Sequence, residues 1–277
     1  CCIIFMFTTI KLYNGSSIKR GWRTIIIKCK DRGQMAHNFT GICLISSRVN
    51  ELSHFYSLLF NSKSKGDHIF SYFKINGGMF SIFSTIGMKS MAPNSMKNAL
   101  HGGSIIEFVT NNIISKYETL LTSYSSSLSE PQKNEHGEQI LWLNDPDGNV
   151  IRLTEKNCDN NSAAGIQFEG ISIMTNKLEE ITSLYEKILK NEKKQIQLYN
   201  LFQTKKLNLK IYNKVDIEFA IPFTINQMGG GSFTIEVRVP DIDQKYEVLK
   251  ELNVEIVKEP TTQLWGRRSV WFRDQEN

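Results

Sequence analysis

The hydrophobic and polar positions of this chain alternate between the two-residue period of a strand and the 3.6-residue period of a helix. A helix is predicted near residues 50–60, with apolar side chains at helical spacing: Leu52, Phe55, Tyr56 and Leu59. A second predicted helix covers residues 113–124. Strands are predicted around these helices, at residues 40–46, 69–75, 79–84, 105–110, 139–143 and 150–154. The first half of the chain therefore contains two successive units, each with one helix among strands.

The second half of the chain repeats this pattern at a constant spacing of 129 residues. Gly41 matches Gly170, Tyr56 matches Tyr185 and Glu107 matches Glu236 at this spacing. The register persists through further aromatic, glycine and proline positions of the first copy: Tyr117, Pro131, Gly137, Trp142 and Asp145. Such a long period indicates a duplicated domain rather than a solenoid. We therefore expect an α+β protein with four similar units.

The domain boundaries follow from the repeat. We expect one domain over residues 35–156, a linker rich in Asn, Ser, Ala and Gly over residues 157–165, and a second domain over residues 166–277. Residues 1–34 lack a persistent period, and we interpret them as a non-native or upstream leader before Met35, with a clipped signal peptide as the alternative. The second copy stops before a counterpart of residues 150–154, which predicts a C-terminal truncation and an unpaired sheet edge.

The net charge of +5 does not describe the duplicated part of the chain. Residues 1–34 contain seven basic residues and one acidic residue, so the remainder carries a net charge of −1. A near-neutral body gives no indication of a nucleic-acid or anionic-membrane partner. No apolar run approaches the roughly 20 residues of a membrane helix. Because only Cys43 and Cys158 lie outside the leader, we expect no disulfide framework and a cytoplasmic location.

Three stretches of sequence carry a resemblance to a known family. They are Leu-Ser-His-Phe-Tyr at residues 52–56, the hairpin at residues 142–153 with its Asp-Pro-Asp-Gly-Asn turn, and Val-Arg-Val-Pro-Asp-Ile-Asp at residues 237–243. Together with the duplication they resemble the vicinal oxygen chelate (VOC) superfamily, which includes glyoxalase I, bleomycin-resistance proteins, fosfomycin-resistance proteins and extradiol dioxygenases. The resemblance implies tandem domains, each of two βαβββ modules that form a curved mixed-sheet cup with helices outside.

Many members of this superfamily hold a divalent metal ion on the concave face of the cup, through His and Glu side chains on strands. The resemblance places the ligand positions of this chain at Gly41, Gly170, Ser81, Glu218, Ile105, Thr234 and Arg152. Only Glu218 could bind a metal, and Arg152 would repel one. We therefore expect no metal and no other cofactor. The five histidines are interpreted as solvated or capping residues, with His68 and His101 as the alternatives nearest the cup mouth.

Strand alternation and the ligand positions together predict the side chains that line the cups. These are Cys43, Glu107, Trp142, Arg152, Glu218, Thr234, Glu236, Arg238 and Trp271. Ser172 is expected to share the face of Gly170. An alternative is that the glutamates form structural ion pairs with Arg152 and Arg238 while the tryptophans fill the core. A carboxylate buried without a cation would instead have a raised pKa and could act as a general base.

Three functions are compatible with this sequence. The leading hypothesis is a metal-free protein that binds or sequesters a small organic molecule, planar or amphiphilic, in an aromatic cup with a few polar anchors. The alternative is an enzyme, a metal-dependent glyoxalase-like lyase or an extradiol ring-cleaving dioxygenase with displaced ligands. The third is a structural remnant whose cups are filled by side chains. The ligand and the oligomeric state are not indicated by the sequence.

Overall fold

The computed structural model describes residues 3–9, 37–96, 104–134, 136–156, 165–221, 232–263 and 266–274. Within them the first copy comprises β2 (Asn38–Ser46), α1 (Val49–Phe60), β3 (Lys65–Gly66), β4 (Phe70–Lys74), β5 (Met79–Ser84), α2 (Thr85–Met91), β6 (Ser104–Thr110), α3 (Ile113–Tyr124), η1 (Ser125–Ser127), β7 (Gln132–Lys133), β8 (Gln139–Asn144) and β9 (Val150–Glu155). The second copy comprises β10 (Ile166–Thr175), α4 (Leu178–Leu189), β11 (Lys194–Ile196), β12 (Tyr199–Gln203), β13 (Asn208–Asn213), α5 (Lys214–Glu218), β14 (Ser232–Arg238), α6 (Ile242–Glu251), β15 (Ile256–Thr262) and β16 (Arg267–Arg273). A further strand, β1, covers Ile3–Thr9.

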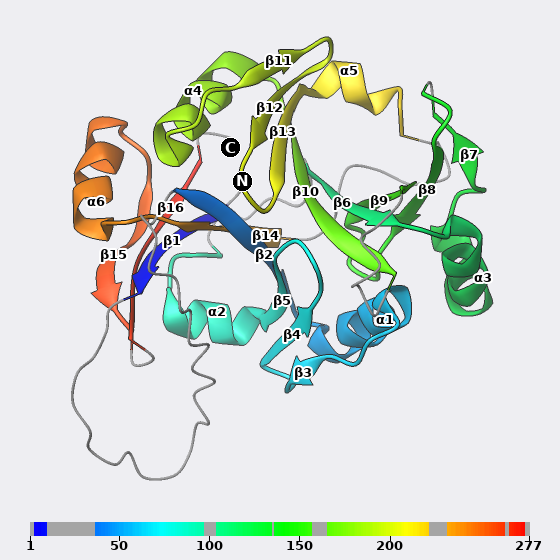
Figure 1. Cartoon of the computed structure of the whole chain (residues 1–277). Helices are drawn as coiled ribbons and strands as arrows, with labels where there is room; N and C mark the ends of the chain where they lie inside the picture. The colour runs from blue at the N-terminus through cyan, green and yellow to red at the C-terminus, as the bar shows by residue number, and fades with distance from the viewer. Residues whose placement is uncertain are drawn as a thin grey trace.

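All four long helices carry an apolar stripe, and two of them, α3 and α6, also begin at a residue whose side chain caps the helix. Asn112 accepts a hydrogen bond from the Ser115 amide at the start of α3, and Asp241 accepts from two amides at the start of α6. The predicted apolar face of α1 is buried, and α3 begins and ends where the periodicity predicts. Each long helix lies on the outside of the molecule (Figure 1). The α+β fold class is thus confirmed.

The strands form two curved mixed sheets whose composition differs from the expectation. The first sheet has the order β15-β16-β1-β14-β2-β5-β4-β3, and the second has the order β11-β12-β13-β10-β6-β9-β8-β7. Each sheet therefore joins one module of the first copy to one module of the second, through the antiparallel pairs β2–β14 and β6–β10. The expectation that each copy forms its own cup is wrong in this respect. Strand alternation could not decide the matter, because it predicts the same buried face whichever module is the partner.

The two modules of the first copy still contact each other, but they do so through helices and a turn. Helix α1 packs against α3, and the ring of Tyr124 meets Phe55 edge to face at 5.0 Å. The Tyr56 hydroxyl donates to Asp145 Oδ2 at 2.9 Å, which links the Phe-Tyr helix of one module to the Asp-Pro-Asp-Gly-Asn turn of the other. Two motifs that are distant in the sequence are therefore in direct contact in the fold.

Strand β1 occupies the position in the first sheet that β9 occupies in the second. It runs parallel to β14 and antiparallel to β16, as β9 runs parallel to β6 and antiparallel to β8. The expected unpaired edge at this position is therefore absent, and part of the predicted leader belongs to the fold. This strand has seven residues, of which the first five are apolar, so it is too short to show a persistent period. The rest of the leader and most of the predicted linker lie outside the described residues.

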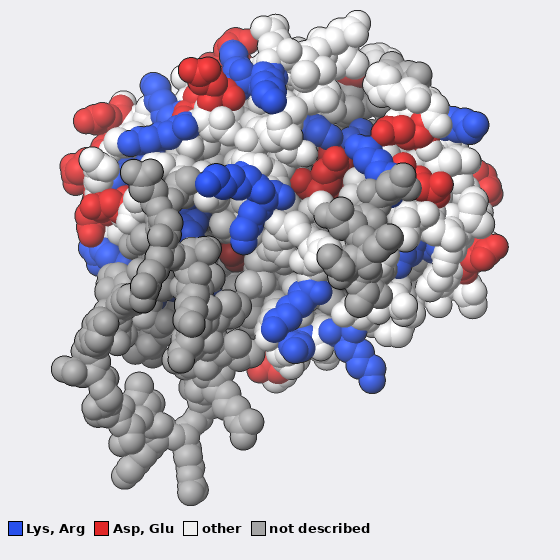
Figure 2. All heavy atoms as spheres, in the orientation of Figure 1, with Lys and Arg blue, Asp and Glu red and all other residues white. Residues whose placement is uncertain are grey.

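One hydrophobic core connects both copies. It lies between the convex sheet faces and the long helices, and Phe108 of β6 packs against Phe168 of β10 with ring centroids 5.4 Å apart. On the face shown in Figure 2 basic and acidic side chains are interspersed. None of the helices in the described ranges is both long enough and apolar enough to cross a membrane.

Candidate functional site

The concave face of the first sheet is packed with side chains. Cys43 of β2 has the side-by-side partners Ser81 of β5 and Thr234 of β14, as the predicted lining requires. Helix α2 covers this face, and its Met88 packs in one cluster with Cys43 and Trp271. Because Cys43 and Trp271 are both buried, this face matches the alternative in which tryptophan fills the interior.

Two cations of the second copy hold α2 and the turn after it against the first sheet. Arg273 donates to the carbonyl oxygens of Asn94 and Ser95 at 2.7 and 3.0 Å. Lys258 Nζ donates to the Met91 carbonyl at 2.8 Å. These bonds satisfy backbone acceptors near the end of the helix, where carbonyl groups have no partner within the helix. The first concave face is therefore closed by a specific set of contacts and offers little room for a ligand.

The concave face of the second sheet has a charged centre instead. Glu107 of β6 is buried, and its Oε1 lies 3.0 Å from a terminal guanidinium nitrogen of Arg152 on β9. Its Oε2 lies 2.5 Å from Lys210 Nζ on β13. The Ser172 hydroxyl on β10 donates to Glu107 Oε1. We call Glu107, Arg152, Lys210 and Ser172 the ion-pair centre; it takes one residue from each of four adjacent strands, two from each copy.

Aromatic and apolar side chains surround the ion-pair centre. The Arg152 guanidinium lies over the Trp142 ring at 5.7 Å, and Lys210 Nζ lies 5.8 Å from the Tyr199 ring centroid. The ring centroids of Tyr199 and Tyr212 are 4.7 Å apart. A cluster of buried side chains continues the wall: Ile105, Ile140, Val150, Met174 and Ile217. Solvent still reaches the centre, because the Arg152 and Lys210 side chains are 21% and 12% exposed.

The electrostatics of the centre keep Glu107 ionised. Burial alone raises the pKa of this carboxyl, but the positive charges of Arg152 and Lys210 and the hydrogen bonds from Lys210 and Ser172 outweigh it and lower the pKa to about 2. Such a carboxylate is a poor general base at neutral pH. Burial also raises the pKa of the Cys43 thiol, which therefore stays protonated.

Glu236, the repeat counterpart of Glu107 in the first sheet, behaves differently. Burial raises the pKa of this carboxyl, and the charges of Arg267 and Arg238 oppose the shift only in part. Glu236 is half-buried. The general-base hypothesis therefore fits Glu107 less well than Glu236, while the alternative of a structural ion pair is met by Glu107 with Arg152.

The lowered pKa of Glu107 predicts a pH dependence of stability. A carboxyl whose folded pKa is about 2, against a reference value of 4.5, stabilises the fold above pH 4.5 and loses that contribution as the pH falls toward 2. The contribution amounts to about 3 kcal/mol. Glu236 and Asp145 have raised pKa values, so their contributions to stability change with pH in the opposite direction. The quantity to measure is therefore the difference in the free energy of unfolding between the wild-type chain and Glu107→Gln. Urea unfolding of the wild-type chain and of Glu107→Gln at several pH values should give free energies that converge between pH 4.5 and 2. A constant difference across this range would contradict the assigned ion pairs.

The residues present do not fit the metal site that the fold family implies. A Cβ added at Gly41 would overlap the Met79 carbonyl oxygen, and one added at Gly170 would overlap the Asn208 carbonyl oxygen. The first-strand positions therefore have no room for a ligand side chain. Arg152 holds the last-strand position of the second sheet. Within the part of the chain that the structure describes, no group of three or more His, Cys, Asp or Glu side chains could hold a metal ion.

Eight of the nine predicted lining residues fall into two groups. Cys43, Thr234, Glu236, Arg238 and Trp271 lie on strands of the first sheet, and Glu107, Trp142 and Arg152 lie together in the second. Glu218 was placed wrongly: it ends helix α5, not a strand, and its side chain lies outside the described residues. Lys210 holds the strand position instead. The repeat spacing of 129 applied to Ser81 leads to Lys210, so a signal for this residue was available in the sequence.

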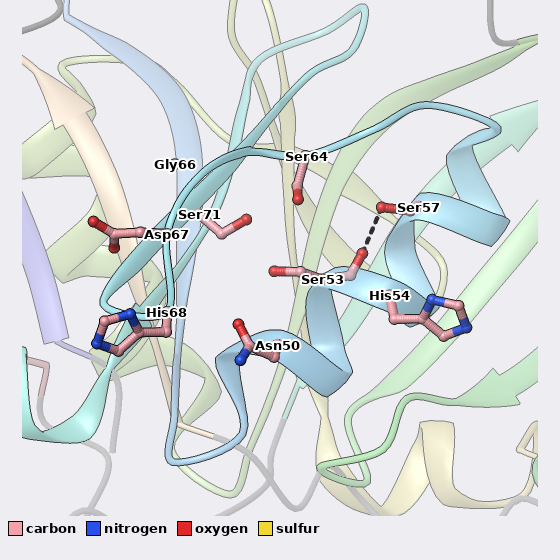
Figure 3. A pocket seen from close by; sticks show the side chains of 9 residues that line it. All are labelled: Asn50, Ser53, His54, Ser57, Ser64, Gly66, Asp67, His68 and Ser71. Carbon is pink, nitrogen blue, oxygen red and sulfur yellow. Dashed lines mark hydrogen bonds between the residues drawn. The ribbon is translucent and has the colours of Figure 1, made fainter.

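Histidines line two surface hollows that are separate from the concave faces. One hollow, with a volume of roughly 290 Å³, lies between α1 and the β3–β4 hairpin. Figure 3 shows that Ser53, Ser64 and Ser71 of its lining turn toward the middle. His54 and His68 lie on opposite sides of it. His37 lines the second hollow, and His101 is outside the described residues. His68 therefore does not approach the charged centre.

Comparisons with known proteins agree with this fold. Residues 202–277 match the family model described as Glyoxalase/Bleomycin resistance protein/Dioxygenase superfamily. Glyoxalase I from Zea mays aligns with a TM-score of 0.61 at 14% sequence identity, covering 87% of this chain and 90% of that chain. A putative dioxygenase from Bacillus subtilis aligns with a TM-score of 0.55 at 13% identity, covering 86% and 81%. No curated protein matches the chain.

The chain has the fold of glyoxalase I over most of its length and carries the superfamily's sequence signature in its second copy, so the resemblance to the VOC superfamily is confirmed. At 13–14% identity the similar structures show the fold alone, and the activity must be argued from the site.

Proposed function

We propose that this protein binds a small organic molecule at the concave face of the second sheet, without a metal or other cofactor, and that it sequesters this molecule in the cytoplasm. The observation that carries the proposal is the ion-pair centre. Glu107, Arg152, Lys210 and Ser172 lie on the four strands from which the fold family takes its metal ligands. Two side-chain cations of the protein thus stand where a divalent ion would be needed.

The asymmetry of the two sheets supports binding at the second sheet. In the first sheet, hydrogen bonds from Arg273 and Lys258 hold α2 and the turn after it against the concave face. In the second, partly exposed cations lie against aromatic rings, an arrangement that suits a ligand with both apolar and polar parts. We propose that the first sheet is a structural support and the second the binding face.

The alternative of a lyase or a dioxygenase has less support. Both reactions in this fold rely on a metal ligand set, and the two glycine positions leave no space for one of the ligands. Glu107 could serve as a base only if its pKa were near neutrality, whereas two cations lower it to about 2. Capture without chemistry requires none of these groups.

A binding experiment on the chelator-treated full chain tests the proposal. Isothermal titration with 2-naphthol and 2-naphthoate should show binding by at least one of these planar probes, with the same affinity before and after EDTA treatment. Lys210→Gln should weaken this binding, because Lys210 lies at the centre. Arg268→Gln is the matched control, since it removes a cation of the first sheet that forms an ion pair with Asp243 of α6.

Two outcomes would contradict the proposal. Loss of probe binding on EDTA treatment, restored by added metal, would favour the metal-dependent alternative. Failure of both probes to bind would favour the hypothesis that both faces are structural.

A further inference from the structure

Counting hydrogen-bond donors and acceptors around the ion-pair centre indicates what kind of group it lacks. The only carboxylate of the centre has both oxygens engaged, Oε1 by Arg152 and Ser172 and Oε2 by Lys210. A guanidinium has five N–H donors and an ammonium has three. Both carboxylate oxygens of Glu107 therefore have partners, while the guanidinium and the ammonium carry more donors than these bonds use.

Two of the leftover donors are buried and have no partner. They are Arg152 Nε and Trp142 Nε1. Trp142 is only 2% exposed, so bulk solvent does not reach its N–H. A buried N–H without a partner is destabilising, because no hydrogen bond offsets the loss of its contact with water. Both donors belong to side chains in contact with each other, because the Arg152 guanidinium lies over the Trp142 ring.

The charges of the centre also indicate that it lacks an acceptor group, and that this group is an anion. Glu107 is ionised and offsets one of the two cations that touch it. The next carboxylate near Arg152 is that of Glu169, and it is bonded to Lys156 at 3.3 Å. The Tyr212 hydroxyl, whose pKa is raised chiefly by burial, is neutral and supplies no negative charge. One positive charge of the centre is left without an anion in direct contact.

We propose that the ligand of the second sheet is an organic anion, a carboxylate on a planar aromatic body, with its oxygens accepting from Arg152, Lys210 and Trp142. This inference rests on the proposed function and names the class of molecule that it binds. The carboxylate supplies the acceptors that the centre lacks and offsets its second cation. The planar body packs against Tyr199, which is half-buried and stacks on Tyr212. The Arg152 head group, 21% exposed, turns to admit the ligand oxygens to the buried donors.

A matched pair of probes tests the class of ligand. 2-Naphthoate and 2-naphthamide share one ring system, and only the first carries a negative charge. Titration calorimetry on the full chain should give a dissociation constant at least tenfold lower for the naphthoate. Lys210→Gln should raise the naphthoate constant at least tenfold and leave the naphthamide constant nearly unchanged. Trp142→Phe keeps an aromatic ring and removes the N–H, and should raise the naphthoate constant severalfold.

Controls separate this inference from the proposed function. Thermal unfolding of each variant shows that it is folded, and Arg268→Gln should bind the naphthoate like the wild-type chain. Equal affinity for the two probes would overturn the anion assignment while leaving small-molecule binding intact. A preference for the naphthoate that neither variant reduces would also overturn it, because the anion would then bind elsewhere. Binding of neither probe would overturn this inference, and the absence of 2-naphthol binding as well would contradict the proposed function.

Discussion

Replacing Glu107 by glutamine should lower the free energy of unfolding by about 3–5 kcal/mol, the range found when one partner of a buried ion pair is removed. The carboxylate is buried between Arg152 and Lys210, which belong to different copies of the repeat. Glutamine has nearly the same shape, so the loss reports the charge rather than packing. The midpoint and slope of urea unfolding at pH 7 measure it.

Glu236→Gln is the matched control, because Glu236 is the repeat counterpart of Glu107 and undergoes the same chemical change. Burial raises the pKa of Glu236, so its charged form is disfavoured in the folded chain and glutamine should cost little or even stabilise. Similar losses for the two variants would contradict the electrostatic difference between the two sheets.

Gly170→Ala should destabilise the chain by about 4 kcal/mol, which combines overpacking with an unfavourable backbone conformation. Gly170 has φ of +155° at an irregularity of β10, and an added Cβ would overlap the carbonyl oxygen of Asn208 on the neighbouring strand. The strain cannot be relieved by a rotamer change, since the opposing atom is backbone. Thermal and urea unfolding measure the loss.

Gly137→Ala is the matched control for Gly170→Ala. Gly137 also has a positive φ, +76°, but an added Cβ there meets no atom within 4 Å. It should cost only about 1–2 kcal/mol, the price of a left-handed conformation for an L-residue. A loss at Gly170 no larger than at Gly137 would show that the strands separate easily, and a ligand side chain could then be accommodated at this position.

Much of the fold was predictable because its signals are local. The period of α3, the Phe-Tyr pair of α1 and the turn at residues 145–149 each act over a few residues, and the duplication is visible as a constant spacing. The pairing of modules was not predictable. It depends on contacts such as Phe108 with Phe168, between segments whose buried faces are alike in either arrangement.

The site was predicted in part for the same reason. Alternation placed Glu107 and Trp142 on the concave face, the family resemblance placed Arg152 there, and the structure brings the three together. Lys210 was missed because a helix residue, Glu218, was assigned to its strand position. That Tyr199 and Tyr212 stack beside Lys210 depends on the pairing of β12 with β13, which follows from the hairpin register rather than from either strand alone.

We propose that two cations of the protein, Arg152 and Lys210, occupy the place of the metal in the second sheet. The most direct test is elemental analysis of the purified full chain, followed by thermal unfolding with added Fe²⁺, Ni²⁺, Zn²⁺ or Mn²⁺. The account predicts far less than one metal ion per chain and no rise in the unfolding temperature with any of these ions. Near-stoichiometric metal, or a clear stabilisation by one ion that Glu107→Gln abolishes, would contradict it and make the lyase or dioxygenase the primary hypothesis.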